Sequence, residues 1–309
     1  MDVVVFGEPL LELSSALPLA NAVDFRLSFS GDALNSAGAA AAAGASTALI
    51  AHVGNDELSA RLVQRVAELG VDTSAVRRTS RPTGAYFVGA DPDGAREFAY
   101  VRSGSAASTM TEDDLSLELL GSARCLLVSG ITAALSPSCE RAVLRAVEVV
   151  VAAGGVALYD PNYRRRLVEV ADARRHLERV AALGALLVPS CPADTSALLG
   201  TDDPRLAGRR CLELGASAVA VTTGPGGVWL FEGAEDPVHV PAAPASVVVD
   251  ATGAGDVFAG TLAARLAAGD DLLAAARLGA AAAALSLAGQ GGTGRLAPLA
   301  ETRELAGRA

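Results

Sequence analysis

The most informative part of the chain is Val247-Val248-Val249-Asp250-Ala251-Thr252-Gly253-Ala254-Gly255-Asp256-Val257-Phe258-Ala259-Gly260. Its β-branched valines predict a buried strand, and the alanine-rich sequence that follows predicts a helix. Gly253 and Gly255 would let the backbone approach a ligand, and the free N–H groups of a first helical turn form an anion site. Asp256 then places a carboxylate beside that site, as phosphoryl transfer to a hydroxyl requires. The alternative is an ordinary strand–turn–helix connection, in which Asp256 is only an N-terminal charge.

The composition limits the possible partners of the chain. It has 309 residues, of which 51% are hydrophobic, and a net charge of −10. An acidic protein lacks the basic surface that nucleic acids need, so no nucleic-acid partner is expected. No apolar run approaches the roughly 20 residues of a membrane span. Residues 1–7 open with an acidic residue and a strand pattern rather than a signal peptide, so a cytoplasmic protein without a membrane partner is expected.

The chain contains no lysine, and all 25 basic residues are arginine. This excludes a Walker-type phosphate loop, Schiff-base chemistry and the strand lysine of protein-kinase-like folds. Phosphates would therefore be bound by backbone N–H groups, arginine and metal. The four cysteines and three histidines are widely spaced, which disfavours a structural zinc site and a Cys–His nucleophile.

Strand and helix patterns alternate along most of the chain. Such alternation, with near-continuous apolar strands, indicates an α/β fold with a mainly parallel sheet covered by helices on both faces. Strands are predicted at residues 3–6, 48–53, 125–129, 156–159, 185–188 and 218–222, with a hairpin at 227–231 and 238–240. Helices are predicted at about residues 30–44, 57–69, 137–153, 171–183, 204–214, 257–268 and 272–288. We expect residues 1–309 to form a single domain.

Two extended segments, at about residues 11–30 and 81–103, do not fit this sheet. Apolar and polar residues alternate towards the end of the first, and the second has a hairpin pattern with a turn at Pro92-Asp93-Gly94. Together they predict a small β lid over one edge of the main sheet. Its exposed edge could pair with another copy of the chain, so a homo-oligomer, a dimer or larger, is expected.

Chemically suggestive residues follow several of the predicted strands. Ligands of open α/β sheets bind at the carboxyl ends of the strands, where Gly31, Asp160, Thr222 and 250–256 are expected. Within Ser30-Gly31-Asp32-Ala33-Leu34-Asn35, Gly31 permits close approach, and Asp32 and Asn35 share the first helical turn. The alternative for this segment is helix N-capping by Ser30 or Asp32.

Two of these motifs resemble those of a known family. The segment from Asp250 to Asp256 resembles the signature of the ribokinase-like (PfkB) carbohydrate kinases, and Ser30 to Asn35 resembles their N-terminal glycine-pair motif, with serine in place of one glycine. The resemblance covers essentially the whole chain. It implies a ribokinase-like three-layer α/β/α fold with a β lid, and it implies ATP and Mg²⁺ as cofactors.

Three further stretches resemble the 2-keto-3-deoxygluconate kinase subfamily: residues 100–106, 129–137 and 160–164. In that subfamily, lid tyrosines and arginines, here Tyr86, Tyr100, Arg102 and Arg164, face the sugar acid. Guanidinium groups suit its carboxylate because they bind it bidentately. The alternatives are an exposed strand-end charge for Arg102 and a solvated arginine run for Arg164. The substrate-binding residues implied are Gly31, Asp32, Asn35, Tyr86, Tyr100, Arg102, Ile131, Arg164 and Asp256.

The resemblance also implies a nucleotide site. Its residues would be Asn162, Arg164, Ser190, Thr222, Gly224, Gly226, Gly227, Thr252, Gly253 and Gly255. The alternative for residues 222–227 is a plain glycine-rich hairpin turn. Asp194 lies near the position of the family's metal-organising glutamate, shifted by one residue, and would act on Mg²⁺ directly or through water.

The implied reaction is transfer of the ATP γ-phosphoryl group to the 6-hydroxyl of 2-keto-3-deoxygluconate. Asp256 would accept the hydroxyl proton, and the N–H groups of Gly253, Ala254 and Gly255 would stabilise the phosphoryl oxygens. A helix N-terminus should make Asp256 a weak base, which a loose transition state tolerates. The alternatives are a kinase for fructose, ribose, a nucleoside or another sugar acid, or a catalytically weak sugar-binding or regulatory homologue.

Overall fold

The computed structural model describes residues 1–89 and 97–308. Within them, the central sheet consists of β1 (Val3–Phe6), β4 (Thr47–Gly54), β5 (Val71–Asp72), β6 (Val76–Thr79), β9 (Cys125–Ser129), β10 (Val156–Asp160), β11 (Leu186–Leu187), β12 (Ala218–Thr222), β13 (Val228–Glu232) and β14 (Val238–Val240). Their order is β14-β13-β12-β11-β10-β9-β1-β4-β5, with β6 also paired to β4. Neighbouring strands are parallel except in the β12–β13 and β13–β14 pairs.

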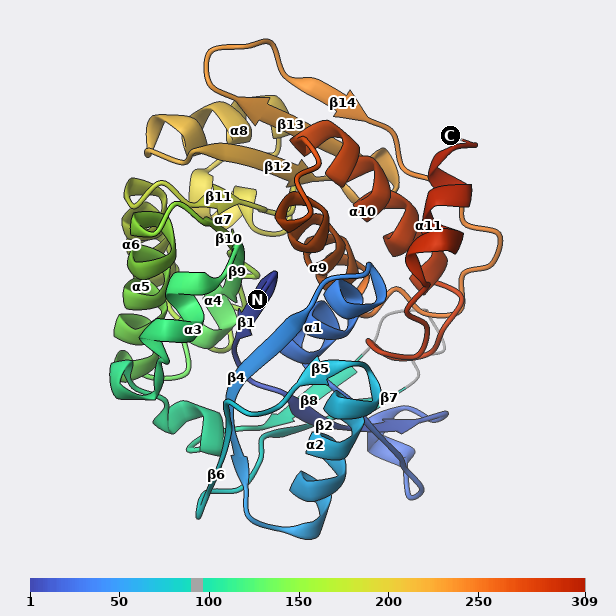
Figure 1. Cartoon of the computed structure of the whole chain (residues 1–309). Helices are drawn as coiled ribbons and strands as arrows, with labels where there is room; N and C mark the ends of the chain where they lie inside the picture. The colour runs from blue at the N-terminus through green and yellow to red at the C-terminus, as the bar shows by residue number, and fades with distance from the viewer. Residues whose placement is uncertain (90–96, 309) are drawn as a thin grey trace.

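Each face of the central sheet buries its own cluster of side chains, because successive residues of a strand point to opposite faces. Val3 and Val5 of β1 belong to one cluster, and Val4 and Phe6 belong to the other. The first cluster is covered by α1 (Asp32–Ala42), α2 (Glu57–Glu68), α9 (Ala254–Ala267) and α10 (Leu272–Ser286). The second is covered by α3 (Leu117–Ser122), α5 (Pro137–Ala152), α6 (Val170–Ala182) and α8 (Pro204–Glu213). The helices flank the strands on both sides in Figure 1, which confirms the predicted α/β/α fold.

Shorter elements complete the described residues. They are α4 (Gly130–Ala133), α7 (Thr195–Leu199), α11 (Leu299–Ala306) and 3₁₀ turns at Leu19–Asn21, Ala106–Thr109, Glu112–Asp114 and Gly224–Gly226. None of the helices in residues 1–89 and 97–308 is long and apolar enough to cross a membrane.

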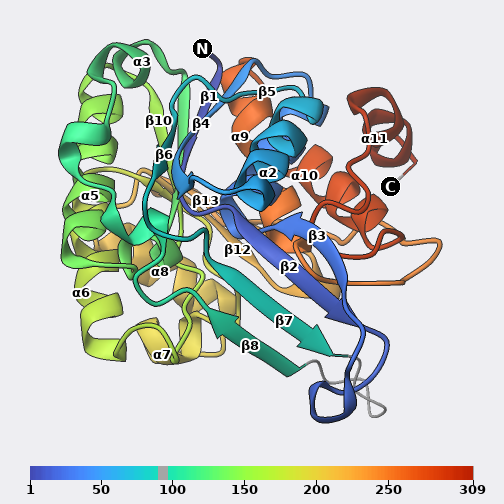
Figure 2. The same cartoon turned by 90° about the horizontal axis from the view of Figure 1, so that it is seen from below.

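A second sheet lies apart from the central one and consists of β2 (Leu10–Ser15), β3 (Arg26–Ser30), β7 (Ala85–Gly89) and β8 (Glu97–Val101). Its order is β3-β2-β7-β8, with β2 antiparallel to β3 and parallel to β7, and β7 antiparallel to β8. We call it the lid sheet; Figure 2 shows it projecting below the helices. The two predicted extended segments thus form the predicted small sheet. The turn predicted at Pro92-Asp93-Gly94 lies outside the described residues.

The buried strand predicted at residues 247–249 is wrong. Val247, Val248 and Val249 are 54%, 67% and 54% exposed and belong to no strand. The N–H groups of Val249 and Asp250 both donate to the carbonyl of Leu287, at 2.7 and 3.1 Å. Because β14 already forms the edge of the central sheet, this segment instead crosses the C-terminal end of α10 on its way to α9.

Candidate active site

A cavity of about 960 Å³ lies between the lid sheet and the carboxyl ends of β10 and β12. The structure brings to it the predicted site residues Gly31, Asp32, Asn35, Tyr86, Tyr100, Arg102, Ile131, Asn162, Arg164, Ser190, Asp194, Thr222, Thr252, Gly253, Gly255 and Asp256. Among the described residues, the predicted ones that do not line the cavity are Gly224, Gly226, Gly227 and Ala254. Strand-end residues that are far apart in sequence therefore converge where open α/β sheets bind ligands.

Two glycines shape the backbone at this cavity. Gly31 precedes α1 with φ of 106°, and a Cβ there would come within 2.6 Å of the Glu8 carbonyl oxygen. Gly253 precedes α9 with φ of 80°, and its Cβ would lie 2.8 Å from the Cα of Gly292. Only glycine tolerates both the positive φ and the close backbone contact at these positions without strain. Neither helix start has a side-chain cap, so the alternative of N-capping by Ser30 or Asp32 is wrong.

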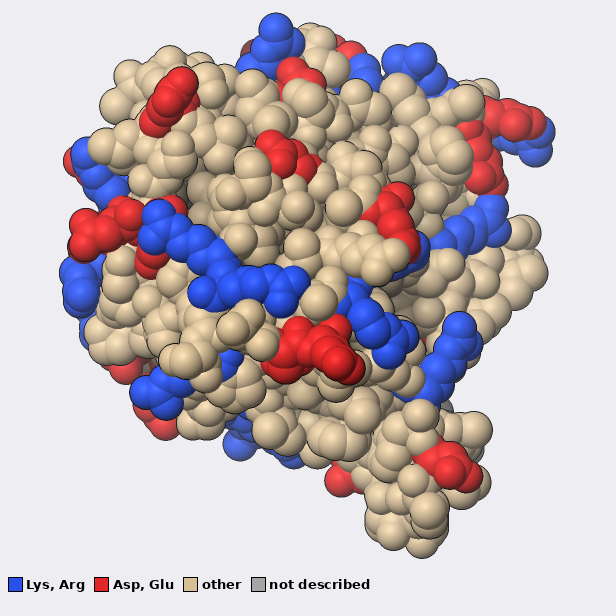
Figure 3. All heavy atoms as spheres, turned by 60° about the horizontal axis from the view of Figure 1, so that its bottom comes forward, with Lys and Arg blue, Asp and Glu red and all other residues tan. Residues whose placement is uncertain are grey.

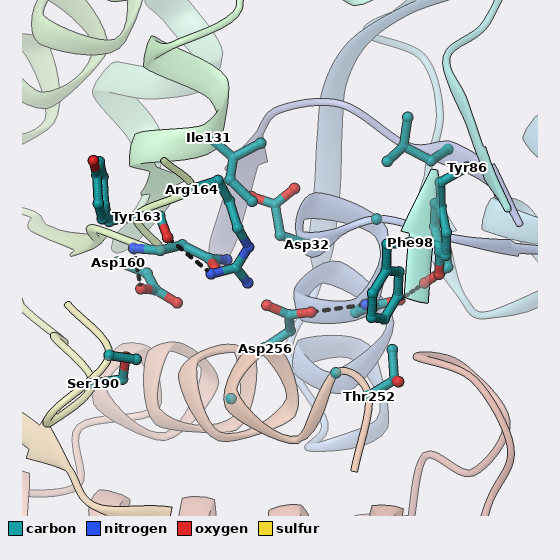
Figure 4. A pocket seen from close by; sticks show the side chains of 18 of the residues that line it. Asp32, Tyr86, Phe98, Ile131, Asp160, Tyr163, Arg164, Ser190, Thr252 and Asp256 are labelled. Carbon is teal, nitrogen blue, oxygen red and sulfur yellow. Dashed lines mark hydrogen bonds between the residues drawn. The ribbon is translucent and has the colours of Figure 1, made fainter. Parts of the chain in front are cut away.

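Asp256 is held by a side chain from another helix. It is the third residue of α9, and its Oδ2 accepts a hydrogen bond of 2.8 Å from Nδ2 of Asn35 on α1. Asn35 is 2% exposed, and its Oδ1 accepts a 3.3 Å hydrogen bond from the Ser30 hydroxyl, which fixes the orientation of the amide. Figure 4 shows the Asp256 carboxylate at the start of α9, facing the cavity. One carboxylate oxygen is thus anchored, while the other stays available.

The surroundings raise the pKa of Asp256 to about 7. Shielding from water is the largest cause, and the nearby carboxylate of Asp32 adds to it; the Asn35 hydrogen bond and the Arg164 charge oppose the rise. The prediction of a weak base at a helix N-terminus is therefore wrong, because burial outweighs the helix dipole here. A carboxylate with a pKa near neutrality is suited to accept a proton from a hydroxyl.

The first turn of α9 offers two backbone donors. Among the described residues, the N–H groups of Gly253 and Gly255 have no hydrogen-bond acceptor. The N–H group of Ala254 differs, since it points to the carbonyl of Ala251 at 3.3 Å. The anion site predicted from three consecutive N–H groups therefore has two free donors, Gly253 and Gly255.

A pair of acidic side chains, Asp160 and Asp194, also lines the cavity. Asp194 is 1% exposed and accepts hydrogen bonds from the N–H of Tyr163 at 2.8 Å and from the N–H and hydroxyl of Ser190 at 2.8 and 2.7 Å. Asp160 ends β10 and accepts from the N–H of Asn162 at 2.9 Å. Burial and the Asp194 charge hold the pKa of Asp160 well above its usual range.

Asp160 is expected from the sequence at a strand end, but it is not among the predicted metal or substrate ligands. Two neighbouring carboxylates, one buried (Asp194) and one half-buried (Asp160), favour a cation. Mg²⁺ in phosphate-transfer sites is held by one or two carboxylates plus substrate phosphates. The donor set therefore fits Mg²⁺. Residues 1–89 and 97–308 contain no group of three or more His, Cys, Asp or Glu side chains that could hold a metal alone.

Arg164 extends from the loop after β10 into the cavity. Its only hydrogen bond among the described residues goes from Nη1 to the carbonyl of Tyr163 at 3.2 Å, and no carboxylate there pairs with it. Figure 4 shows its guanidinium group in the cavity, on the same side as Asp256. Two residues on, Nη1 of Arg166 donates to the Phe98 carbonyl of β8 at 3.2 Å and so connects this loop to the lid sheet. The exposed Arg164 thus also lines the cavity.

Two buried glutamates that the sequence analysis missed hold side chains of the lid. Glu8 accepts from Nη2 of Arg102 and from the hydroxyl of Ser105. Glu12 accepts from the hydroxyl of Tyr86 and, at 2.9 Å, from that of Ser28. The Arg102 side chain is 9% exposed, so the alternative of an exposed strand-end charge is wrong. The only sequence signal was two acidic residues within an otherwise apolar run.

Residues 222–227 form the turn between β12 and β13. The hydroxyl of Thr223 donates to the Gly227 carbonyl at 2.9 Å, and Nε2 of His239 lies 2.7 Å from the Gly226 carbonyl oxygen. Thr222 lines the cavity, whereas Gly224, Gly226 and Gly227 do not. The basic side chains on the face seen in Figure 3 are all arginines and are interspersed with acidic ones.

Comparison with known proteins agrees with this geometry. The model of the pfkB family of carbohydrate kinases matches residues 2–298. The 2-dehydro-3-deoxygluconokinase of Thermoproteus tenax is 35% identical, over 99% of this chain and 94% of its own. Probable fructokinase-4 of Arabidopsis thaliana is 30% identical, over 84% of this chain and 80% of its own. A structure from E. coli described as a ribokinase II in complex with ATP and Mg²⁺ has a TM-score of 0.90 and 26% identity, over 100% of this chain and 99% of that one.

The fold and the site together define a carbohydrate kinase, an enzyme that phosphorylates a small-molecule sugar. The chain belongs to the PfkB family of these kinases.

Proposed function

We propose that the protein transfers the γ-phosphoryl group of ATP to the 6-hydroxyl of 2-keto-3-deoxygluconate, which is also called 2-dehydro-3-deoxygluconate. The observation that carries this proposal is Arg164, a guanidinium group without a carboxylate partner among the described residues, in the same cavity as Asp256. A sugar acid supplies the carboxylate that a neutral sugar lacks. The similarity to the T. tenax 2-dehydro-3-deoxygluconokinase supports the same substrate class.

Asp256 accepts the proton of the sugar hydroxyl in this scheme. Its raised pKa makes it a better base than an ordinary carboxylate, and Asn35 orients it for in-line attack of the hydroxyl oxygen on the γ-phosphorus. As the O–P bond to the sugar forms, the bond from the γ-phosphorus to the bridging oxygen of ADP breaks. The free N–H groups of Gly253 and Gly255 stabilise the negative charge on the transferring oxygens.

The nucleotide site is proposed along the remaining rim. Asn162, Arg164, Ser190, Thr222 and Thr252 line the cavity that also contains the anion site. Gly224, Gly226 and Gly227 follow Thr222 in the chain and would contact the nucleotide outside the cavity. The similar E. coli structure, described as a complex with ATP and Mg²⁺, supports ATP as the nucleotide.

Asp160 and Asp194 would hold Mg²⁺ together with the ATP phosphates. Because each oxygen of Asp194 already accepts a hydrogen bond, this residue would act through water. When bound, Mg²⁺ neutralises phosphate charge, which matters in a chain without lysine.

The sugar site is proposed between α1 and the lid sheet. Asp32 and Asn35 would face the sugar hydroxyls, with Gly31 allowing close approach and Ile131 packing against the ring. Tyr86, Tyr100 and Arg102 would cover the sugar from the lid, which also excludes water and limits ATP hydrolysis.

A panel of sugars with ATP and Mg²⁺ tests this function. We expect the highest kcat/KM for 2-keto-3-deoxygluconate. A clear preference for fructose, which the similarity to the A. thaliana fructokinase makes the second candidate, would overturn the sugar-acid assignment. Absence of phosphorylation of any sugar would indicate a binding or regulatory protein instead.

We further propose that the protein is a homo-oligomer that pairs through the lid sheet. The edge strand β8 carries Tyr100 and Val101, which are 44% and 62% exposed, and an edge strand with exposed apolar side chains is a template for pairing with another chain. Sedimentation equilibrium tests this, with a monomer at micromolar concentration as the contrary outcome.

A further inference from the structure

Two arginines reach the cavity from opposite sides, and they differ in their electrostatic state. Arg102 comes from the end of the lid sheet, is 9% exposed, and contacts the Glu8 carboxylate, which is 1% exposed. Arg164 comes from the loop after β10, is exposed, and pairs with no carboxylate among the described residues. The Arg102 charge is therefore held in a direct, buried ion pair, whereas the Arg164 charge acts on the carboxylates of Asp256 and Asp160 only from a distance and stays open to a ligand.

The position and the contacts of Glu8 fix the Arg102 side chain. Glu8 lies two residues after the end of β1 and two residues before the start of β2, so strands of both sheets constrain its backbone. One carboxylate oxygen contacts Nη2 of Arg102, and the other accepts from the hydroxyl of Ser105. The guanidinium carbon also lies 5.9 Å from the centre of the Tyr100 ring. These contacts leave the side chain little freedom.

Neutralisation of the Arg102 charge by Glu8 changes how Arg102 interacts with a ligand. A buried ion pair has no net charge, and its field falls off faster with distance than that of a lone cation. Such an arginine still donates hydrogen bonds, to a hydroxyl or keto oxygen as readily as to a carboxylate. An exposed guanidinium group outside any ion pair, such as that of Arg164, instead favours an anion.

We propose that Glu8 sets the charge preference of the sugar site. Because Glu8 neutralises Arg102, that side chain donates hydrogen bonds to the sugar without favouring a carboxylate. Discrimination between an acidic and a neutral sugar then depends on Arg164. This inference rests on the proposed function, since it assigns roles within the same sugar site. Glu8 is a positioning residue that acts through Arg102.

The test compares kcat/KM for 2-keto-3-deoxygluconate with that for fructose, in the wild type and in variants. Glu8→Gln keeps an oxygen for Arg102 and removes the negative charge. Glu12→Gln is the matched control, because Glu12 is a buried glutamate of the same segment whose partners are the hydroxyls of Tyr86 and Ser28. Arg102→Met and Arg164→Met remove each cation in turn.

We call kcat/KM for 2-keto-3-deoxygluconate divided by kcat/KM for fructose the acid-to-neutral ratio. We expect Glu8→Gln to raise this ratio about threefold or more, mainly through a lower KM for the acid, because Arg102 becomes an uncompensated cation. Glu12→Gln should leave the ratio within about twofold of the wild type, even if overall activity falls. Arg102→Met should lower kcat/KM for both sugars by similar factors. Arg164→Met should lower the ratio about tenfold or more. The Glu8→Gln/Arg102→Met double variant should return the ratio to the wild-type value.

An unchanged ratio in Glu8→Gln would overturn the inference. So would an Arg102→Met variant whose activity falls selectively for the acid. If Glu8→Gln does not fold, Arg102→Met alone decides whether Arg102 only donates hydrogen bonds to the sugar or specifically binds its carboxylate.

Failure of the proposed function is separate, because it is seen in the wild type as a preference for fructose. Competitive inhibition of the fructose reaction by gluconate and by glucitol then supplies the same acid-to-neutral ratio for every variant.

Discussion

Asn35 and Asp256 lie 221 positions apart in sequence, yet a 2.8 Å hydrogen bond joins their side chains across the contact of α1 with α9. The donor is buried and is itself oriented by Ser30. The carboxylate that we propose as the base is therefore positioned by a helix from the other end of the chain. The alignment of the base depends on how these two helices pack.

Asn35→Leu should weaken catalysis and move its pH dependence. The Asn35 hydrogen bond lowers the pKa of Asp256, so its loss should shift the acidic limb of kcat/KM to higher pH. At pH 7 we expect a loss of about tenfold or more. A pH–rate profile measures both effects, with Ser36→Ala on the same helix as the control. An acidic limb that stays in place would show that Asn35 does not act on the base.

Asp256→Asn should lower turnover and raise the free energy of unfolding at alkaline pH. Because the pKa of Asp256 is raised from 3.8 to about 7 in the folded protein, its stabilising effect is complete below pH 3.8 and is lost as the pH rises towards 7. At pH 8 the variant should be more stable than the wild type by up to about 4 kcal/mol, and near pH 4 the two should converge. Turnover should fall by a factor of about 100 or more. Urea unfolding at pH 4.5 and pH 8 measures the difference; equal stability at pH 8 would contradict it.

Gly253→Ala and Gly255→Ala form a matched pair at the start of α9. Gly253 has φ of 80° and packs against Gly292, whereas a Cβ on Gly255 meets nothing within 4 Å. We expect Gly253→Ala to cost about 1–3 kcal/mol in unfolding free energy. Gly255→Ala should be neutral or stabilising by up to about 1 kcal/mol. Thermal unfolding compares them, and equal melting temperatures would refute the role of the positive φ.

His176→Leu should flatten the acid side of the stability profile. His176 is 4% exposed on α6, its ring nitrogens have no hydrogen-bond partner among the described residues, and burial lowers its pKa to about 4. The folded protein therefore favours the neutral ring, and stability is lost as the pH falls from 6.5 towards 4. Removing the ring should eliminate a loss of up to about 3 kcal/mol between these pH values. Unfolding curves from pH 8 to pH 4.5 test this, and parallel profiles would contradict it.

The central sheet was predictable because its strands are continuous apolar runs. Residues 125–129 and 218–222 were predicted with the bounds that β9 and β12 have. The two-residue strands β5 and β11 carry too little pattern to define their ends, and β5 was not predicted at all. The valines at 247–249 have a strand composition, but only tertiary structure shows that the sheet already ends at β14.

The candidate site was predictable where motifs mark it, as at Asp256 and Asn35. The charge states were not, because they depend on burial and on neighbours distant in sequence. Asp256 has a raised pKa for these reasons, and the same reasons pair Arg102 with Glu8. A sequence pattern shows that an arginine is near a ligand, whereas only the fold shows whether its charge is already compensated.

The lid sheet and the first turn of α1 belong to one uninterrupted piece of chain. Ser30 is the last residue of β3, Asp32 is the first residue of α1, and Gly31 alone separates them. The strand that covers the sugar site and the helix that orients the base through Asn35 are therefore joined at one residue. A substitution at Gly31 would consequently disturb the sugar-covering sheet and the alignment of the base at once.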